Sequence, residues 1–418
     1  MKKSFGAILD EYRGVGPGFD LLRLSLSIAI FVSHIGYIAG TRGIFPSAVD
    51  LILRVFGTHP LGASSISAST QAPTYVNGVV NMAGAGAGLT HPIVLSHVPM
   101  FFALSGFLVA GSAFRTKKVA SFLTLRVLRI FPALAVEVTL SALFIGSFLT
   151  ALPLSAYLSH PHFLTYLGNI LGLVQMDLPG VVFNPSGAPT IVNTNLWTLK
   201  GEFYCYLFLS AAMATAVLYH RAVALVAFLL LTTAVIVSNI FYGYLYVPNG
   251  VLDTGLNVYY FIAGLVFFLW RDKIPSNWPL FVVSIALVYF FIVKPYGVFL
   301  APLPLVYATV FIGTCRLPQP NFLKSGDYSY GIYLYGFPIT QLLIVCFPWL
   351  KGNYFGLFVP AFGLTVTFAV LSWHGIEKRF LRLKKFVAPS SAKVTEALRP
   401  GTIDNSPELG FRRKEVKA

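Results

Sequence analysis

Long apolar stretches separated by short polar segments dominate the chain. Ten of them have the length and apolar character expected of helices that cross a bilayer, for which about 20 apolar residues suffice. They are residues 19–40, 94–113, 126–150, 196–218, 222–240, 255–270, 278–294, 297–314, 327–349 and 355–376. An eleventh stretch, 161–175, is weaker. The pattern predicts an all-α fold, a polytopic membrane helix bundle of about ten transmembrane helices.

The basic residues that flank these stretches set the predicted orientation, because cytoplasmic loops carry an excess of Lys and Arg. If 161–175 does not cross, 25 of the 30 basic residues fall on the side that holds both termini. The outer side then receives only Arg42, Arg54, Lys294 and Lys351, while Lys200 lies within a stretch. A crossing at 161–175 would invert every later loop and remove this asymmetry. We therefore expect ten spans with both termini in the cytoplasm.

The same pattern divides the chain into three parts. Residues 1–18 form a cytoplasmic N-terminal segment, and 19–383 form the integral-membrane domain with long outer loops at 41–93 and 151–195. Residues 384–418 are polar and contain Pro and Ser, so a disordered cytoplasmic tail is expected there.

Composition agrees with a membrane protein, since 56% of residues are hydrophobic and only 11% are charged. The net charge of +15 does not indicate a nucleic-acid partner, because the basic residues flank apolar spans instead of forming one patch. Anionic membrane lipids are the expected partners of these residues. The three cysteines fall inside apolar stretches without a CxxC or Cys/His cluster, so no metal site is expected.

Ionisable residues within a span are costly and indicate function. Arg23 and His34 are eleven residues apart in the first span, which places them on one helix face about 16 Å apart. In the third span, Arg126 and Arg129 share a face with Glu137, eleven residues after Arg126. The three arginines would form an inner layer, and His34 and Glu137 an outer layer. The alternatives are a structural core histidine and arginines that only anchor the helix to lipid phosphates.

Glu202 lies about two turns inside the span that starts near Asn195, at a depth similar to that of His34. Either Glu202 or Glu137 could therefore orient the imidazole, which would act as a general base. A structural carboxylate is the alternative for Glu202. Near the last inner boundary, His374 and Glu377 read as an interfacial pair.

Two further motifs carry polar groups. The small-residue span FFALSGFL contains Ser105, and SYGIYLYGFP places Tyr330 and Tyr333 on one helix face. Small residues also permit close helix packing, and tyrosines also form interfacial belts, so both motifs have a structural alternative. From these residues alone, a membrane enzyme competes with a transporter or flippase for a glycan or lipid precursor, and with a structural membrane protein.

Five pieces in order resemble the acyltransferase-3 family of polytopic membrane O-acyltransferases. They are Arg23 with His34 eleven residues later, FFALSGFL at 101–108, RVLRIFP at 126–132, LWTLKGEFY at 196–204, and SYGIYLYGFP at 329–338. The resemblance covers about residues 19–380. It departs from the family at Gly336, where many members carry a histidine.

The resemblance implies transfer of an acyl group, usually acetyl, from a cytoplasmic coenzyme A thioester to a sugar hydroxyl in a surface or exported glycan. We expect acetyl-CoA as the donor, a glycan or lipid-linked sugar as the acceptor, and a multi-pass location in a bacterial plasma (inner) membrane. The expected catalytic residues are His34, Glu202 and Glu137. The expected donor-binding residues are Arg126, Arg129 and Arg23, and the expected substrate-binding residues are Ser105, Trp197, Tyr330 and Tyr333. Direct transfer and an acyl-histidine relay both remain open.

Overall fold

The structure is a computed structural model. It describes residues 3–12, 14–40, 75–76, 79–80, 91–182, 191–215, 217–242, 254–292, 294 and 297–387. Most of the expected outer loop 41–93, part of the loop 151–195 and the expected disordered tail from residue 388 lie outside these ranges. Within 41–93 the structure describes a short antiparallel pair, β1 (Tyr75–Val76) with β2 (Val79–Val80).

Each of the ten predicted stretches contains a helix, which confirms the all-α membrane bundle. The helices that match them in chain order are α2 (Phe19–Ala39), α4 (His91–Thr116), α5 (Val119–Leu140), α9 (Leu196–Ala214), α10 (Arg221–Tyr242), α11 (Thr254–Trp270), α12 (Trp278–Phe291), α13 (Pro302–Thr314), α15 (Ser329–Cys346) and α16 (Tyr354–Ser372). Six helical segments of the described chain are long and apolar enough to span a bilayer, namely Phe19–Ala39, Pro92–Thr116, Val119–Leu149, Arg221–Ser238, Ser329–Cys346 and Tyr354–Phe386. Helices α11, α12 and α13 are apolar but shorter.

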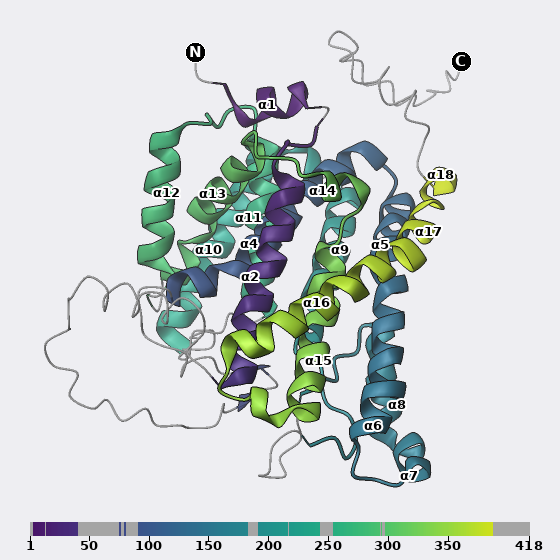
Figure 1. Cartoon of the computed structure of the whole chain (residues 1–418). Coiled ribbons are helices and arrows are strands. Elements are labelled where there is room, and N and C mark those ends of the chain that lie inside the picture. The colour runs from purple at the N-terminus through teal and green to yellow at the C-terminus, as the bar shows by residue number, and fades with distance from the viewer. Residues whose placement is uncertain are drawn as a thin grey trace, which may run out of the picture.

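Short elements cover the two ends of the bundle (Figure 1). At one end lie α1 (Phe5–Glu11), α14 (Asn321–Ser325) and α18 (Lys384–Val387), and at the opposite end lie α6 (Ser147–Leu149), α7 (Leu154–Ser159) and α8 (Pro161–Leu167). The first group contains segments that the basic residues assign to the cytoplasm. In the second group, α7 and α8 belong to the expected outer loop 151–195, and α6 lies at the end of the predicted stretch 126–150. The remaining short elements are the π-helix η2 (Ser141–Gly146) and the 3-10 helices η3 (Gly168–Leu171), η4 (Val217–Tyr219), η5 (Gly297–Phe299) and η6 (Pro348–Leu350).

The weak stretch 161–175 forms only α8 and η3, which together are too short to cross a bilayer. Gly172 then turns the chain with a φ of 87°. This arrangement agrees with the expectation that 161–175 does not form a span.

Glycines allow a close contact between α4 and α11. A Cβ added to Gly106 on α4 would lie 2.0 Å from the carbonyl oxygen of Phe261 on α11, and one added to Gly264 would lie 2.1 Å from that of Ala103. The two helices therefore approach each other backbone to backbone, as small residues allow within a membrane.

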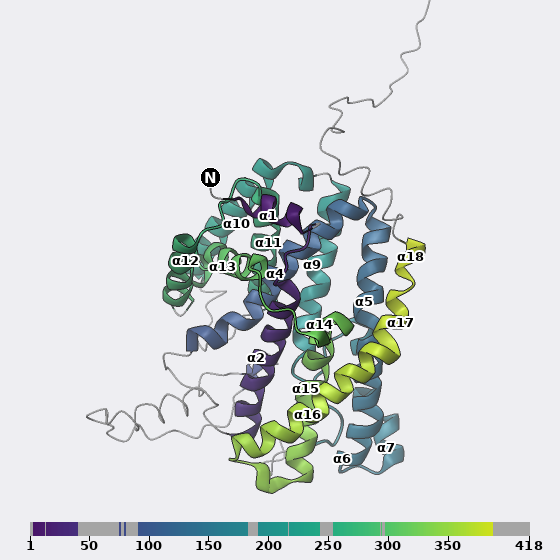
Figure 2. The ribbon, with the colours of Figure 1, turned by 45° about the horizontal axis from the view of Figure 1, so that its top comes forward.

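Helix α16 crosses α15 and α2 obliquely and leads back to the end of the bundle that holds α18 (Figures 1 and 2). It continues through the π-helix η7 (Trp373–Glu377) into α17 (Lys378–Leu381). A π-helical turn adds a residue to the helix and is frequent at functional sites. Here it places Glu377 in the interior, where its side chain is 1% exposed.

Candidate active site

A cavity of about 390 Å³ lies between α2, α4, α5, α9 and α15, and the segment from η7 to α18 closes one end. Several of its polar lining residues come from the motifs that the sequence singled out. The polar and ionisable residues that line it are Arg23, Ser105, Arg126, Arg129, Thr198, Glu202, Tyr206, Asp327, Ser329, Tyr330, Tyr333 and Lys384. The structure thus brings the three predicted arginines into one cavity with Glu202, Ser105 and both predicted tyrosines.

An ion-pair network fixes two of the three arginines at the end near α18. Asp327 forms ion pairs with Arg23, at 2.8 Å, and with Arg129, at 2.6 Å, through the same carboxylate oxygen. Arg129 also contacts Glu377 at 3.3 Å. Because each of its two terminal nitrogens contacts a different carboxylate, the guanidinium of Arg129 is held in place and its charge is largely compensated.

Asp327 precedes α15 and remains ionised in this network. Burial alone would raise the pKa of Asp327, but Arg23, Arg129 and hydrogen bonds from Ser329 hold that pKa well below its usual range. A carboxylate shared by α2 and α5 therefore ties both helices to the start of α15.

Arg126 has a different environment from Arg129. Its Nη2 donates to Ser112 Oγ at 2.8 Å, and its guanidinium lies 5.6 Å from the ring centre of Phe122 and 6.0 Å from that of Tyr206. In the described part of the chain it makes no salt bridge, and its buried Nε has no hydrogen-bond partner. Such a guanidinium can still bind an anion, since charge-assisted hydrogen bonds to phosphate are strong.

Glu202 lies in this cavity and accepts a hydrogen bond from the hydroxyl of Tyr206, one turn further along α9. The ring of Tyr206 also lies beside the guanidinium of Arg126. The hydrogen bond from Tyr206 thus places the Glu202 carboxylate on the side of the cavity where Arg126 lies. The described residues show no hydrogen bond between Glu202 and His34. Its predicted catalytic role stays a prediction.

Hydroxyl groups gather at the other end of the cavity. Tyr333 on α15 lies within 2.5 Å of Thr198 Oγ1 on α9, and its hydroxyl also donates to the backbone oxygen of Asn195, at 3.4 Å. The side chain of Asn195 in turn donates to the backbone oxygen of Tyr333, at 2.5 Å. Phe101 on α4 packs against the Tyr333 ring. The Tyr333 hydroxyl is thereby held at a fixed position in the cavity wall.

His34 lies one helical turn beyond this end. Ile30 lines the cavity, and His34 follows it by four residues on the same face of α2. The imidazole packs edge to face against Phe337 with ring centres 5.2 Å apart, and Phe337 itself is one turn beyond Tyr333 on α15. Arg23 and His34 therefore lie toward opposite ends of the cavity, as the eleven-residue spacing predicts. No hydrogen bond to the imidazole of His34 is present among the described residues.

Glu137 and Trp197 are not among the residues that line the cavity. Glu137 is 1% exposed, and its Oε1 accepts hydrogen bonds from Ser141 Oγ at 2.7 Å and Asn193 Nδ2 at 2.9 Å. Its Oε2 is buried without a hydrogen-bond partner in the described chain. Trp197 is half-buried at the start of α9. The roles predicted for both residues stay predictions.

Sequence reasoning missed several residues of the site. It placed Glu377 near the last inner boundary but did not predict that its side chain is buried. Asp327 directly precedes the SYGIYLYGFP motif, and Thr198 lies within LWTLKGEFY, so both were close to recognised signals. The sequence signal for Asp327 was its position as a single acidic residue at the boundary of a predicted span. Lys384 was assigned to the tail, but it reaches the cavity through α18.

Comparison with known proteins agrees with the geometry. The model of a family described as "Acyltransferase domain" matches residues 17–374. An O-acetyl transferase of Shigella phage Sf6 is 29% identical over 296 residues, which cover 68% of this chain and 84% of the relative. Nodulation protein 10 of Rhizobium leguminosarum bv. viciae is 28% identical over 308 residues, or 69% of this chain and 82% of the relative. No solved structure matches the chain.

Proposed function

The chain belongs to the acyltransferase-3 family and is a membrane O-acyltransferase; on this basis we propose that it moves an acetyl group from cytoplasmic acetyl-CoA to a sugar hydroxyl of a surface or exported glycan, at a bacterial inner membrane. The name of the phage relative supports acetyl as the group transferred. The observation that carries the proposal is one cavity with Arg126 at one end and the Thr198–Tyr333 hydroxyl pair at the other.

The donor would enter from the end that the basic residues assign to the cytoplasm. Coenzyme A carries phosphates, and Arg126 offers a guanidinium that forms no salt bridge with a carboxylate in the described chain. Lys384 lines the same end and adds a second cation. The pantetheine arm would then extend along the cavity toward Tyr333, which brings the thioester near the level of His34.

At that level, His34 would act as the general base. A sugar hydroxyl is a poor nucleophile at neutral pH and needs a base near its oxygen. As His34 removes the hydroxyl proton, the oxygen attacks the thioester carbonyl and forms the new C–O bond. The C–S bond then breaks, and the proton on His34 passes to the departing thiolate to give free coenzyme A. Tyr333 or Ser105 could donate a hydrogen bond to the carbonyl oxygen as it gains negative charge.

Mass spectrometry of surface glycans and lipids from cells with and without the gene tests this proposal. We expect loss of a mass equal to one acetyl group per modified sugar in the deletion strain, and its return with the intact gene but not with His34→Ala. Identical acetylation in all strains would rule out glycan acetylation. Donor consumption is measured separately, with purified protein in lipid nanodiscs and radiolabelled acetyl-CoA.

A further inference from the structure

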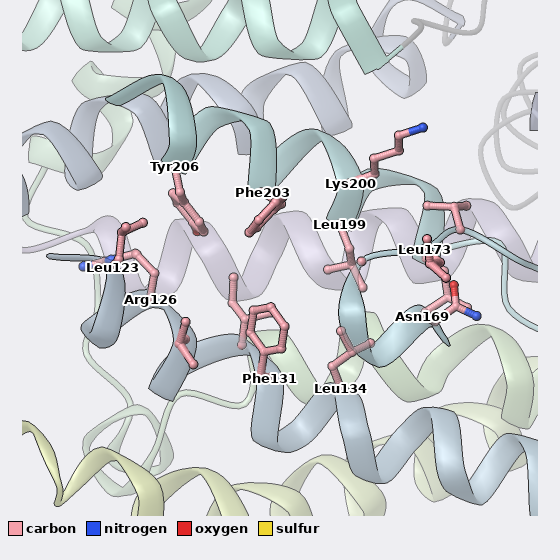
Figure 3. Close-up of a pocket in the computed structure, with 15 residues that line it drawn as sticks. Leu123, Arg126, Phe131, Leu134, Asn169, Leu173, Leu199, Lys200, Phe203 and Tyr206 are labelled. Carbon is pink, nitrogen blue, oxygen red and sulfur yellow. The ribbon is translucent and has the colours of Figure 1, made fainter. Parts of the chain in front are cut away.

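A second, narrower space lies beside the cavity, between α5 and α9 (Figure 3). Its walls are one stripe of each helix, from Leu123 to Leu134 on α5 and from Leu196 to Tyr206 on α9. Asn169, Gly172, Leu173 and Val174, from η3 and the segment after it, complete the lining near Lys200. Eleven helical residues span about 16 Å along the axis. The enclosed volume is only about 40 Å³, so we call this space the α5–α9 groove.

The α5–α9 groove is apolar and open on one side. Val127 and Phe203 line it from the two helices and are 46% and 39% exposed. Since Val119–Leu149 is apolar and long enough to span a bilayer, the medium at this opening is lipid hydrocarbon. This small apolar volume suits a single hydrocarbon chain.

Charge is found at both ends of the groove (Figure 3). Arg126 and Tyr206 close one end, while Lys200 lies at the other with its ammonium group directed away from the apolar centre. Lys200 is exposed, lies 5.9 Å from the ring centre of Tyr204 and makes no salt bridge within the described residues. By the distribution of basic residues, the Lys200 end faces the outer leaflet. A lipid phosphate beside this ammonium would gain a favourable electrostatic contact.

The groove and the cavity share a wall. Arg126, Ile130, Leu199 and Tyr206 line both spaces. Thr198, at the hydroxyl end of the cavity, is two residues from Lys200 on the first turns of α9, and residues two apart point to opposite sides of a helix. A group attached to a phosphate at Lys200 therefore has to pass only the end of α9, a distance on the order of 10 Å, to reach the cavity.

We propose that the α5–α9 groove binds the hydrocarbon chain of a lipid phosphate that carries the acceptor sugar, with the phosphate at Lys200. This inference rests on the proposed function, because it names the acceptor class as a sugar linked through phosphate to a single long chain. The chain lies in the groove, and the sugar extends around the start of α9 toward Thr198 and Tyr333.

Photolabelling of the full-length protein in nanodiscs tests the site without requiring activity. The probe is a polyprenyl phosphate with a diazirine in its chain, and the neutral polyprenol with the same diazirine is the matched reagent. We expect the phosphate probe to label peptides from 123–134 and 196–206. Val127→Trp, which fills the groove, should lower this labelling at least fivefold, whereas Val226→Trp, at an exposed position of α10, should not.

The charge at Lys200 is tested separately. Lys200→Gln should lower labelling by the phosphate probe about fivefold and leave labelling by polyprenol unchanged, while Lys351→Gln should affect neither. Equal labelling of wild type and Val127→Trp, or labelling spread over α10 and α12, would overturn the groove as a site. Displacement of the probe by an equal concentration of phosphatidylglycerol would show a site for bilayer phospholipid and overturn the acceptor assignment.

Activity measurements separate this proposal from the proposed function. With acetyl-CoA as donor, Val127→Trp should raise KM at least fivefold for a sugar linked to polyprenyl phosphate, and leave KM for a free oligosaccharide of the same sugar unchanged. Unchanged KM for both acceptors would reject the groove while acetyl transfer stands. If wild type transfers acetyl to neither acceptor but the labelling pattern is as expected, the proposed acetyl transfer fails and the lipid site remains.

Discussion

Asn193 donates a hydrogen bond to the backbone oxygen of Leu334, at 3.1 Å, and Leu334 lies four residues before Pro338 within α15. A proline has no N–H, so the helix itself leaves this carbonyl without its usual donor. Asn193 is completely buried, and the same amide nitrogen also donates to Glu137. The Asn193 side chain thus supplies the missing donor to the Leu334 oxygen and links α15 to α5 through Glu137.

Replacement of Asn193 should therefore destabilise the protein. Asn193→Ala leaves the Leu334 oxygen buried without a partner, which costs about 1–3 kcal/mol. Thermal unfolding in detergent, followed by circular dichroism, measures the loss. In a Pro338→Ala background the helix regains its own N–H donor, so the same change should cost less. Equal losses in both backgrounds would mean that the contact to Leu334 contributes nothing to stability.

The two arginines of the RVLR segment should behave differently. Arg126→Ala should raise KM for acetyl-CoA about ten- to a hundredfold without lowering the melting temperature, because it removes a charge-assisted contact to phosphate. Arg126→Lys should restore little, since lysine lacks the planar pair of donors. Initial rates at varied acetyl-CoA give KM. An unchanged KM in Arg126→Ala would assign the donor phosphates to other residues.

Arg129→Ala should act first on stability. It leaves Glu377 and Asp327 without one of their partners, and loss of one member of a buried ion pair costs about 3–5 kcal/mol. The double variant Arg129→Ala with Glu377→Gln should recover part of the melting temperature, because the uncompensated carboxylate is gone. A full melting temperature in the single variant would contradict the proposed role of the ion pairs.

His34 should control the rate of acetyl transfer. We expect His34→Ala and His34→Gln each to lower kcat about a hundredfold or more, since neither side chain accepts the proton. Both variants should still bind coenzyme A, measured by calorimetry, because the proposed phosphate contacts lie toward the opposite end of the cavity. Near-normal turnover in a folded His34→Gln variant would make His34 a structural residue.

Glu202→Gln and Glu137→Gln then identify the carboxylate that supports the imidazole. The supporting residue should lose much of kcat, and the other should lose little. Glu202 lines the cavity, whereas Glu137 is held by Ser141 and Asn193 outside its lining, so we expect the larger effect at Glu202. Melting temperatures are the control. The reverse order, with unchanged stability, would assign the role to Glu137.

Topology can be tested by cysteine labelling in intact cells. After replacement of the native cysteines, Lys118→Cys should react only with a membrane-permeant maleimide. Lys351→Cys should also react with an impermeant one, because the basic residues assign the two positions to opposite sides. Labelling of both positions by the impermeant reagent would contradict the ten-span arrangement.

Helical periodicity and hydropathy were sufficient to predict the apolar helices and the grouping of Arg23, Arg126 and Arg129, because spacing along each helix determines which residues share a face and a depth. The partners of these arginines could not be predicted. Asp327 lies just before α15 and Glu377 lies in η7, and only the packing of whole helices brings them to α5. Likewise, the link from Asn193 to Leu334 depends on where a loop enters the bundle.

The backbone contact between Gly106 and Phe261 has a mechanical consequence for turnover. Ser105, in the cavity wall, immediately precedes Gly106, and helix α4 cannot move closer to α11 or rotate against it without collision. This side of the cavity is therefore fixed in position. Any widening that admits a bulky thioester has to come from the opposite side, where the ion pairs of Asp327 with Arg23 and Arg129 would have to separate.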